Sequence, residues 1–207
     1  MAEVEYPHGI PRIIVVLSSV LQHTADCNDY QLIHPSPLPH SAVAFFALSK
    51  PEISIRRYLE RIFRFARCSS SCYVVAYIYL DRFLSLHPSL ALDSFNVHRL
   101  LITSILTAVK FMDDRYFNNA YFARVGGITL AEMNYLEVDF LFGLRFDLNV
   151  APVIFASYCG VLEREFSLAD PQIPPRLRLH CFFSNEENNN NNNNKNNKLQ
   201  QQKQLIV

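Results

Sequence analysis

The 207-residue sequence lacks several features that would assign it to a protein class. It has no excess charge of either sign, with 19 basic and 19 acidic side chains, so it has no general attraction to nucleic acid or anionic lipid. It contains no Cys-x-x-Cys pair. Its five cysteines are an odd number, which indicates buried thiols in a reducing compartment rather than a disulfide framework. No basic cluster precedes the first apolar run, residues 13–21, so we do not expect a secretory signal.

Recognisable catalytic motifs are also missing. The sequence has no glycine-rich phosphate loop, no His-Glu-x-x-His motif and no clustering of its seven histidines. Asp113 and Asp114 are adjacent and could form a metal or acid–base pair. Neighbouring residues on a helix do not face each other, however, so such a pair is more often a solvated helix end. We therefore expect a protein that is not an enzyme and that needs no cofactor or metal.

An apolar stretch within residues 93–114 predicts the element at the centre of the fold. Between residues 97 and 112 nearly every side of a helix would be apolar, and a helix that is apolar all round is a buried one. Polar residues interrupt the run, which is too short to cross a bilayer comfortably. The pattern predicts an all-α bundle around this helix, which is capped by Asp93 or Ser94 and ends near Lys110 in a polar cluster.

Other periodic patterns predict further helices around the central one. We expect them over residues 11–27, 52–67, 72–86, 118–125, 129–144 and 149–164. Thr129 and Glu132 form a capping box at the start of one, and Gly126-Gly127 closes the helix before it. We assign residues 1–50 to an N-terminal helix and a proline-containing linker. Residues 167–207 form an Asn-rich tail that is disordered by composition.

Charged residues on these helices have alternative interpretations. The arginine-rich face of residues 52–67 could contact nucleic acid, but we favour a solvated face with one arginine tied to a core carboxylate. Asp81 interrupts the inner side of the next helix and is expected to be paired, because an unpaired buried charge is costly. Lys110 and Glu137 project from otherwise apolar helices. If these helices are neighbours, the two residues form either a polar pair on a partner-binding surface or a private salt bridge.

Several motifs resemble those of a known family, the cyclins. YIYLDRFL at residues 77–84, AVKFMDD at residues 108–114 and LEVDFLFGLRFDL at residues 136–148 resemble helix motifs of the cyclin box. NVHRLLITS, NNAYFARVGGIT and EMNYLEVDFL are more closely similar to plant P-type cyclins, also called U-type. These in turn resemble the yeast cyclin of the phosphate-starvation response. The resemblance implies a single five-helix cyclin box at residues 51–148, with an extra N-terminal helix and an additional C-terminal helix at residues 149–166.

The resemblance also implies a function. It identifies the chain as a regulatory subunit that binds and activates a cyclin-dependent serine/threonine kinase and contributes no catalytic group. The residues that match kinase-binding positions of the family are Lys110, Phe111, Glu137, Leu141 and Phe146. Asp81 matches an aspartate that pairs with an arginine of the first box helix, for which Arg57 is the corresponding candidate here.

The expected partners are such a kinase and the substrates that it phosphorylates, with no membrane and no direct nucleic-acid contact. We expect the protein inside the cell, in the nucleus, the cytoplasm or both. The alternative is a cyclin-fold helical adaptor, or a nucleic-acid-associated module, that acts without a kinase. Binding to a kinase subunit, or DNA binding with a steep salt dependence, distinguishes these functions.

Overall fold

A computed structural model describes residues 10–31 and 43–167, and the regular elements of this part are all α-helices. The described residues belong to one compact unit, Met1–Arg176, and the expected disordered tail lies almost entirely outside them. The helices are α1 (Arg12–Gln31), α3 (Ile55–Ala66), α4 (Ser70–Leu86), α5 (Val97–Met112), α6 (Asn119–Gly126), α7 (Leu130–Gly143) and α8 (Pro152–Ser167). This arrangement confirms the expected all-α fold.

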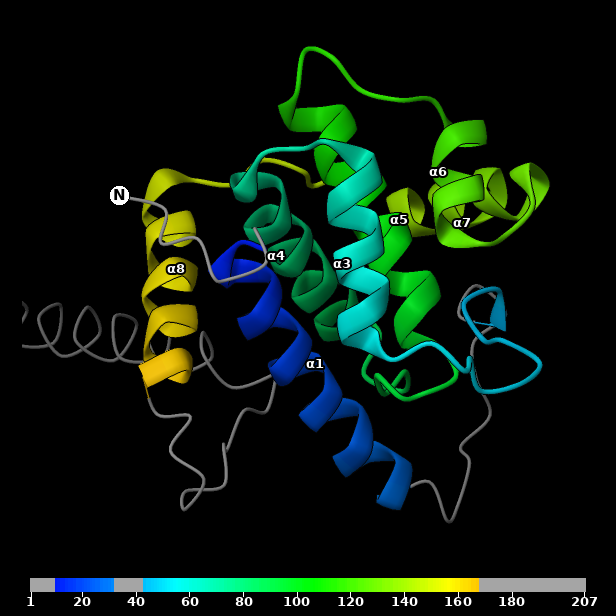
Figure 1. Cartoon of the computed structure of the whole chain (residues 1–207), viewed down its shortest axis with the longest axis horizontal. Helices are drawn as coiled ribbons and strands as arrows, with labels where there is room; N and C mark the ends of the chain where they lie inside the picture. The colour runs from blue at the N-terminus through cyan, green and yellow to red at the C-terminus, as the bar shows by residue number, and fades with distance from the viewer. Residues whose placement is uncertain (1–9, 32–42, 168–207) are drawn as a thin grey trace, which may run out of the picture. The chain divides into compact units, whose positions relative to one another are not determined.

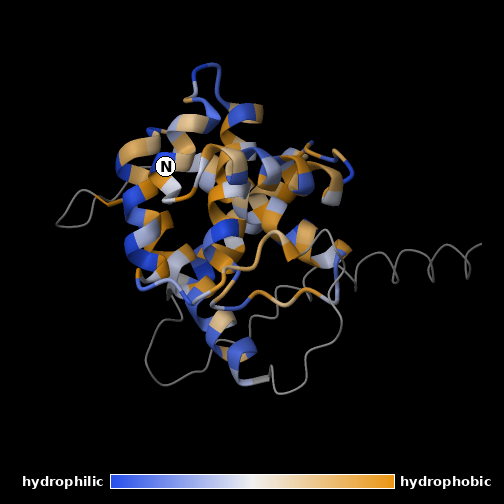
Figure 2. Ribbon diagram, turned by 90° about the vertical axis from the view of Figure 1, so that its right-hand side faces the viewer, coloured by the Kyte–Doolittle hydropathy of each residue, from blue (hydrophilic) through white to orange (hydrophobic). Residues whose placement is uncertain are grey.

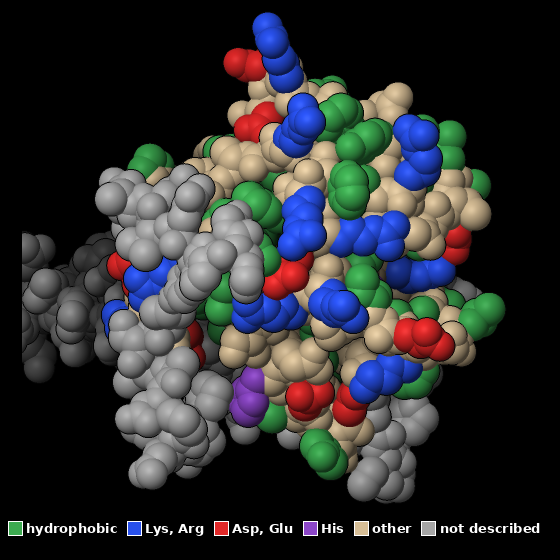
Figure 3. All heavy atoms as spheres, in the orientation of Figure 1, with side chains coloured by type: hydrophobic (Ala, Val, Ile, Leu, Met, Phe, Trp, Pro, Cys, Tyr) green, Lys and Arg blue, Asp and Glu red, His purple; other side chains and the backbone are tan. Residues whose placement is uncertain are grey.

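α5 is the central helix of the bundle, as the sequence predicts (Figure 1). It packs against α3, α4, α6 and α7, and Leu100, Ile102 and Leu106 on its different sides are fully buried. Only surrounding helices can remove all sides of such a helix from water. The surrounding helices alternate between hydrophobic and hydrophilic residues along their ribbons (Figure 2), and charged side chains lie at the molecular surface (Figure 3).

α1 is part of the packed core and is not a separate N-terminal extension. It contacts α3, α4 and α8, and Ile14 and Leu21 are fully buried in these contacts. The helix also continues beyond residue 27, where the sequence predicts its end. Its last turns are held by tertiary bonds: the Asn28 side chain donates to the carbonyl of Leu92 at 2.7 Å, and the Asp29 carboxylate accepts from the segment before α5. α1 therefore packs together with the helices that follow residue 51 in one core.

Two helix boundaries form as their local signals predict. The Thr129 hydroxyl accepts from the N–H of Glu132 at 3.1 Å, and the Glu132 carboxylate accepts from the N–H of Thr129 at 2.9 Å, which completes the capping box of α7. The N–H and the hydroxyl of Thr129 both donate to the Glu132 carboxylate, and these two bonds lower the pKa of that carboxyl. Gly127 closes α6 with a left-handed φ of 73°, a conformation in which glycine has no steric cost.

The start of α5 corrects a prediction, because neither Asp93 nor Ser94 is the N-cap. That position is Asn96, and its side chain accepts from the N–H of Asp93 at 2.9 Å. The Asp93 carboxylate in turn accepts from the N–H groups of Phe95 and Asn96 at 2.8 and 3.1 Å. Ser94 bonds Asp29 of α1 through both its N–H and its hydroxyl. These residues therefore stabilise the turn that precedes the helix and attach it to α1.

Two cysteines lie in the interior as the composition suggests. Cys68 and Cys72 are buried and free, and burial raises the pKa of the Cys72 thiol to about 12. The thiol therefore stays protonated at neutral pH and packs as a small apolar group. Cys181 lies outside the described residues.

Gly143 occupies a position where α7 passes against the ring of Phe83. A Cβ at residue 143 would collide with that ring and would lie 3.1 Å from Cε1 of His87. The Phe83 ring is buried, and its centroid lies 4.8 Å from Phe140 and 5.2 Å from Phe45. Because the ring has little room to move, we expect Gly143→Ala to lower the free energy of unfolding by about 1–3 kcal/mol. Urea denaturation measures this change.

Gly160 of α8 provides the matched control, because a Cβ there meets no atom within 4 Å. Alanine exceeds glycine in helix propensity by about 1 kcal/mol, so Gly160→Ala should stabilise the chain. If both variants were stabilised alike, the close approach of α7 to Phe83 would not constrain residue 143.

Candidate partner-binding site

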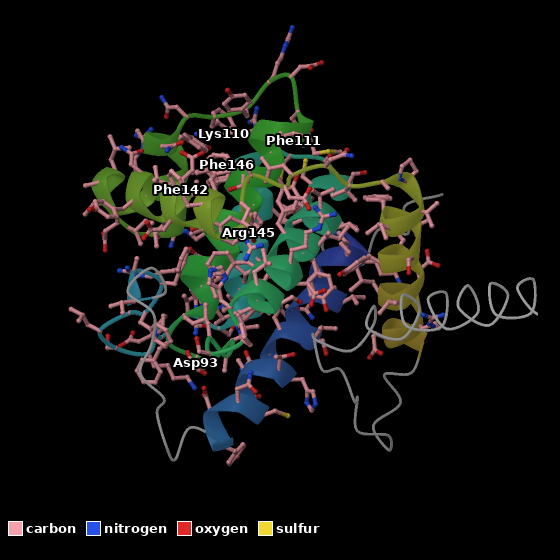
Figure 4. The ribbon with its side chains drawn as sticks, turned by 180° about the vertical axis from the view of Figure 1, so that it is seen from behind. Asp93, Lys110, Phe111, Phe142, Arg145 and Phe146 are labelled. Atoms are coloured by element: carbon pink, nitrogen blue, oxygen red, sulfur yellow. The ribbon has the colours of Figure 1, made fainter. Side chains whose placement is uncertain are left out.

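Two charged residues of the predicted site meet where α5 ends beside α7. Lys110 lies in the last turn of α5 and Glu137 lies in α7, and the Lys110 Nζ donates to the Glu137 Oε1 at 2.6 Å. Lys110, Phe111, Phe142 and Phe146 lie at the same end of the bundle (Figure 4). The structure therefore confirms that the two helices are neighbours and that the pair forms within the chain. The role of the pair in kinase binding stays a prediction.

Asn119, which is not among the site residues predicted from the sequence, also contacts Glu137. Its side-chain amide donates to the Glu137 Oε2 at 2.7 Å and to the side-chain oxygen of Asn134 at 2.8 Å. Both carboxylate oxygens of Glu137 are thus occupied, and its side chain is 14% exposed, compared with 29% for Lys110. An ammonium group has three N–H donors. In the described part of the chain Lys110 bonds Glu137 alone, so its remaining donors can reach a partner.

Large apolar side chains are exposed at this end of the bundle. Phe111, Phe142 and Phe146 are 52%, 67% and 56% exposed, and Leu141 is half-buried. The rings of Phe142 and Phe146 lie edge to face, with centroids 5.1 Å apart. Met112, at the end of α5, is also exposed. Met112 and Phe142 are not among the site residues predicted from the sequence, although the four-residue spacing of Phe142 and Phe146 was a signal for Phe142.

The turn after α7 has a strained backbone that displays Phe146. The N–H of Arg145 donates to the carbonyl of Phe142 at 2.9 Å, and the N–H of Phe146 donates to that of Leu141 at 3.0 Å, the two bonds of a Schellman motif. The left-handed residue of this motif is usually glycine. Here Arg145 and Phe146 both have left-handed φ values, 54° and 57°. Each such residue costs about 1–2 kcal/mol, so other contacts must stabilise the turn.

α4 supplies those stabilising contacts. The hydroxyl of the buried Tyr79 donates to the carbonyl of Leu148 at 2.6 Å. The Arg82 guanidinium donates to the carbonyls of positions 147 and 149 at 3.0 and 2.9 Å. These bonds fix the chain directly after Phe146. Arg82 belongs to the YIYLDRFL motif, which is recognisable in the sequence. The carbonyl groups that Arg82 bonds lie 65 and 67 residues further along the chain, and no local pattern connects them to Arg82.

Substitution of Arg145 tests whether backbone strain is stored in this turn. Because glycine adopts a φ of 54° without steric cost, we expect Arg145→Gly to preserve the free energy of unfolding or raise it by up to about 1 kcal/mol. Arg145→Val should lower it by about 1–2 kcal/mol, because a β-branched side chain is most strained there. Urea denaturation compares the two variants. Equal destabilisation by both would show that the arginine side chain, and not the backbone conformation, matters at this position.

The expected ion pair between Asp81 and Arg57 does not form. Arg57 is exposed on α3, and none of the salt bridges in the described part of the chain includes it. Asp81 is buried in α4, and its carboxylate accepts from the Tyr158 hydroxyl of α8 at 2.5 Å. Burial and the Asp81 carboxylate raise the pKa of Tyr158, so the hydroxyl remains the donor. The contact spans 77 residues and joins α8 to the bundle.

Within residues 10–31 and 43–167, no cluster of three or more His, Cys, Asp or Glu is placed to hold a metal ion. No helix of those segments combines the length and apolarity needed to cross a membrane. Asp113 is half-buried and the adjacent Asp114 is exposed, just after the end of α5.

Known proteins are similar in sequence to this chain over most of its length. A family model described as Cyclin matches residues 10–148, a span that includes α1 as well as α3 to α7. The chain is 61% identical over 185 residues to Cyclin-P4-1 of Oryza sativa subsp. japonica, a match that covers 88% of this chain and 87% of that protein. It is 53% identical over 171 residues to Cyclin-U4-1 of Arabidopsis thaliana, covering 83% and 84%. Cyclin-U3-1 of the same organism is 48% identical over 157 residues, covering 75% and 69%.

Proposed function

This chain belongs to the cyclin family, among the plant P-type and U-type cyclins, and we propose that it binds and activates a cyclin-dependent serine/threonine kinase. Cyclins are in general non-catalytic regulators with a kinase partner, which supports a regulatory role. The observation that carries the proposal is the exposed cluster of Phe111, Phe142 and Phe146 at the end of the bundle that holds Lys110. Large exposed apolar side chains gathered at one end of a domain are typical of a protein-binding surface.

The proposed contact is with the regulatory helix of the kinase. Lys110 offers N–H donors, which suit the free carbonyl groups at the end of a helix. Phe111, Leu141 and Phe146 would be buried against the apolar side of the same helix. Glu137 is bonded on both carboxylate oxygens, so its proposed role is to orient Lys110 toward the kinase.

Activation then follows from a shift of population. A kinase alone samples a state in which its regulatory helix is rotated out and its Lys–Glu ion pair is not formed. In the inward state the helix is rotated in and the ion pair is formed. A protein that binds the inward state more tightly than the outward state increases the population of the inward state. A change from about 1:99 to about 99:1 requires about 5.5 kcal/mol of differential binding. At about 25 cal/mol per Å², about 220 Å² of apolar surface would supply it before association costs, and one aromatic side chain buries about 150–250 Å².

The test is binding and activation of purified plant cyclin-dependent kinases. We expect a one-to-one complex by light scattering, and phosphorylation of a substrate peptide only when both proteins are present. Turnover by the isolated chain that is abolished by Asp113→Asn together with Asp114→Asn would favour an enzyme instead. Steep salt-dependent DNA binding without kinase binding would favour the nucleic-acid alternative. We further propose that the complex acts in the nucleus, the cytoplasm or both.

A further inference from the structure

Arginine side chains gather on one side of the bundle, over α3 and α6. Arg57, Arg61 and Arg64 are separated by four and three residues, so they lie on one face of α3. The Arg61 Nη2 donates to the carbonyl of Arg124 in α6 at 3.0 Å, which places Arg124 beside them. We call these four residues the arginine face. Lys and Arg side chains concentrate over these helices in Figure 3. Residues of the proposed kinase surface are labelled in Figure 4, which shows the molecule from the opposite side.

Within residues 10–31 and 43–167, no acidic side chain forms a salt bridge with the arginine face. Five salt bridges occur in the described part of the chain, and none includes a residue of this face. Glu60, the acidic residue of α3, bonds Arg56 at 3.0 Å instead. The whole chain has equal numbers of basic and acidic side chains, so the concentration of unpaired arginines is a property of this surface and not of the composition.

The needs of folding account for some of these arginines but not for Arg57. Arg64 lies in the last turn of α3, where the helix dipole favours a cation. Arg61 satisfies a carbonyl at the end of α6. Arg57 lies in the first turn of α3, where the dipole disfavours a positive charge, and its side chain bonds no other described residue. An anionic ligand would explain why a cation is present at this position.

The arginine face is held on a fixed framework. The Tyr58 hydroxyl of α3 donates to the carbonyl of Gly126 at 3.1 Å, and the Tyr121 hydroxyl of α6 donates to the carbonyl of Phe65 at 3.0 Å. Together with the bond of Arg61, these contacts join the two helices at three places. The guanidinium groups of α3 and α6 therefore start from helices whose spacing does not need to be organised by a ligand.

We propose that the arginine face binds a phosphorylated peptide segment. Each of its cations is an arginine, and a guanidinium binds phosphate through two parallel hydrogen bonds, which an ammonium cannot do. Seven residues of helix separate Arg57 from Arg64, a rise of about 10 Å. About three residues of extended peptide span the same distance. A phosphoserine and a second anion about three residues away can therefore contact both ends of the face.

A nucleic acid fits this face less well than a phosphopeptide. Single-stranded nucleic acids bind through exposed aromatic rings on which bases stack. The ring of Tyr121 is already stacked on Phe117, with centroids 4.0 Å apart, and the Arg124 guanidinium lies 5.7 Å from its centre. The chain also has no net positive charge to attract a polyanion from a distance.

Fluorescence anisotropy with the full chain tests the proposal. The probes are a labelled short peptide with one phosphoserine and a glutamate three residues later, the same peptide with serine or glutamate in place of phosphoserine, and a single-stranded oligonucleotide. We expect the phosphopeptide to bind at least about tenfold more tightly than the other three probes. Arg57→Gln combined with Arg64→Gln should weaken phosphopeptide binding about tenfold or more. Neither of these side chains bonds another described residue.

Arg115→Gln combined with Arg164→Gln is the matched control, because it removes the same charge from exposed positions elsewhere. This control should change phosphopeptide affinity by less than about twofold. Equal binding of the serine or glutamate peptide, preference for the oligonucleotide, or equal losses in the two double variants would overturn the proposal. The assay contains no kinase, so it can fail while kinase binding succeeds, and kinase binding can fail while this face binds its ligand.

Discussion

We expect Lys110→Ala to weaken kinase binding strongly while leaving the chain folded. Lys110 lies at the end of α5, and its ammonium has donors left after its bond to Glu137. In the proposed complex these donors satisfy carbonyl groups of the partner, which would be buried and unpaired without them. The loss of such a charged hydrogen-bonding partner typically costs ~2–5 kcal/mol, or about 30-fold to several thousand-fold in affinity. Titration calorimetry against the kinase measures the change.

The effect of Lys110→Ala on folding should be much smaller. The pair is partly exposed, with side chains 29% and 14% accessible, and water screens its attraction. We expect the free energy of unfolding to fall by about 1 kcal/mol or less. If Lys110→Ala instead unfolds early and binds the kinase normally, the pair is a private salt bridge and the partner surface lies elsewhere.

The salt bridge between Arg99 and Glu132 is the matched control for Lys110 and Glu137. It joins the same two helices, α5 and α7, with an Nη2 to Oε1 distance of 2.7 Å and side chains 23% and 39% exposed. It lies at the opposite end of α5 from Lys110. Arg99→Ala should therefore affect folding at least as much as Lys110→Ala does, but it should leave kinase affinity unchanged. Thermal melts and calorimetry on both variants separate folding from binding.

Exchange of the two charges gives a sharper test of the same surface. Lys110→Glu combined with Glu137→Lys retains an ion pair between α5 and α7. At position 110 it presents a carboxylate to the kinase, where the parent chain presents an ammonium. Because a lysine at position 137 cannot accept from the Asn119 amide, we expect this double variant to lose about 0.5–1.5 kcal/mol of stability but to remain folded. It should bind the kinase at least as poorly as Lys110→Ala, because a carboxylate would then face the carbonyl groups of the partner. Normal kinase binding by this double variant would show that the kinase recognises only the apolar cluster.

The largest expected loss of stability is at the centre of α5. Leu106 is fully buried and Ile105 is 1% exposed. Leu106→Ala or Ile105→Ala removes buried methyl groups and leaves a cavity that rigid helices on every side cannot fill. Each variant should lose about 2–5 kcal/mol, a large part of the stability of a typical domain. Urea denaturation measures the loss.

Leu130 provides the control for Leu106, because it is 47% exposed at the start of α7. Leu130→Ala should change the free energy of unfolding by about 0.5 kcal/mol or less. If Leu106→Ala and Leu130→Ala unfold alike, α5 does not form the core of the bundle.

Features that depend on local patterns were predictable from the sequence. The apolar character of α5 on every side indicated burial, and the spacing of Thr129 and Glu132 indicated a capping box, which the structure confirms. The contact between Lys110 and Glu137 required that two predicted helices be neighbours, and the family resemblance supplied that order. In these cases the signal lies within a few residues or within a recognised motif.

Features that depend on distant contacts could not be predicted in the same way. Asp81 bonds Tyr158 of α8 rather than Arg57, because the chain brings α8 against α4 after the five-helix pattern has ended. The left-handed backbone at Phe146 is stabilised from α4, 65 and more residues away in sequence. No helix propensity or spacing encodes either contact, since both arise from tertiary packing that overrides local preference.

The activity of a purified plant cyclin-dependent kinase, measured with increasing amounts of this chain, tests the central claim most directly. If the apolar cluster around Lys110 stabilises the inward regulatory helix, phosphorylation of a substrate peptide should rise and saturate at one chain per kinase. The Lys110→Ala chain should then require a concentration about 30-fold or more higher for the same activity. If the kinase remains inactive at saturating chain, or if parent and Lys110→Ala chains activate it equally, this account of the surface is wrong.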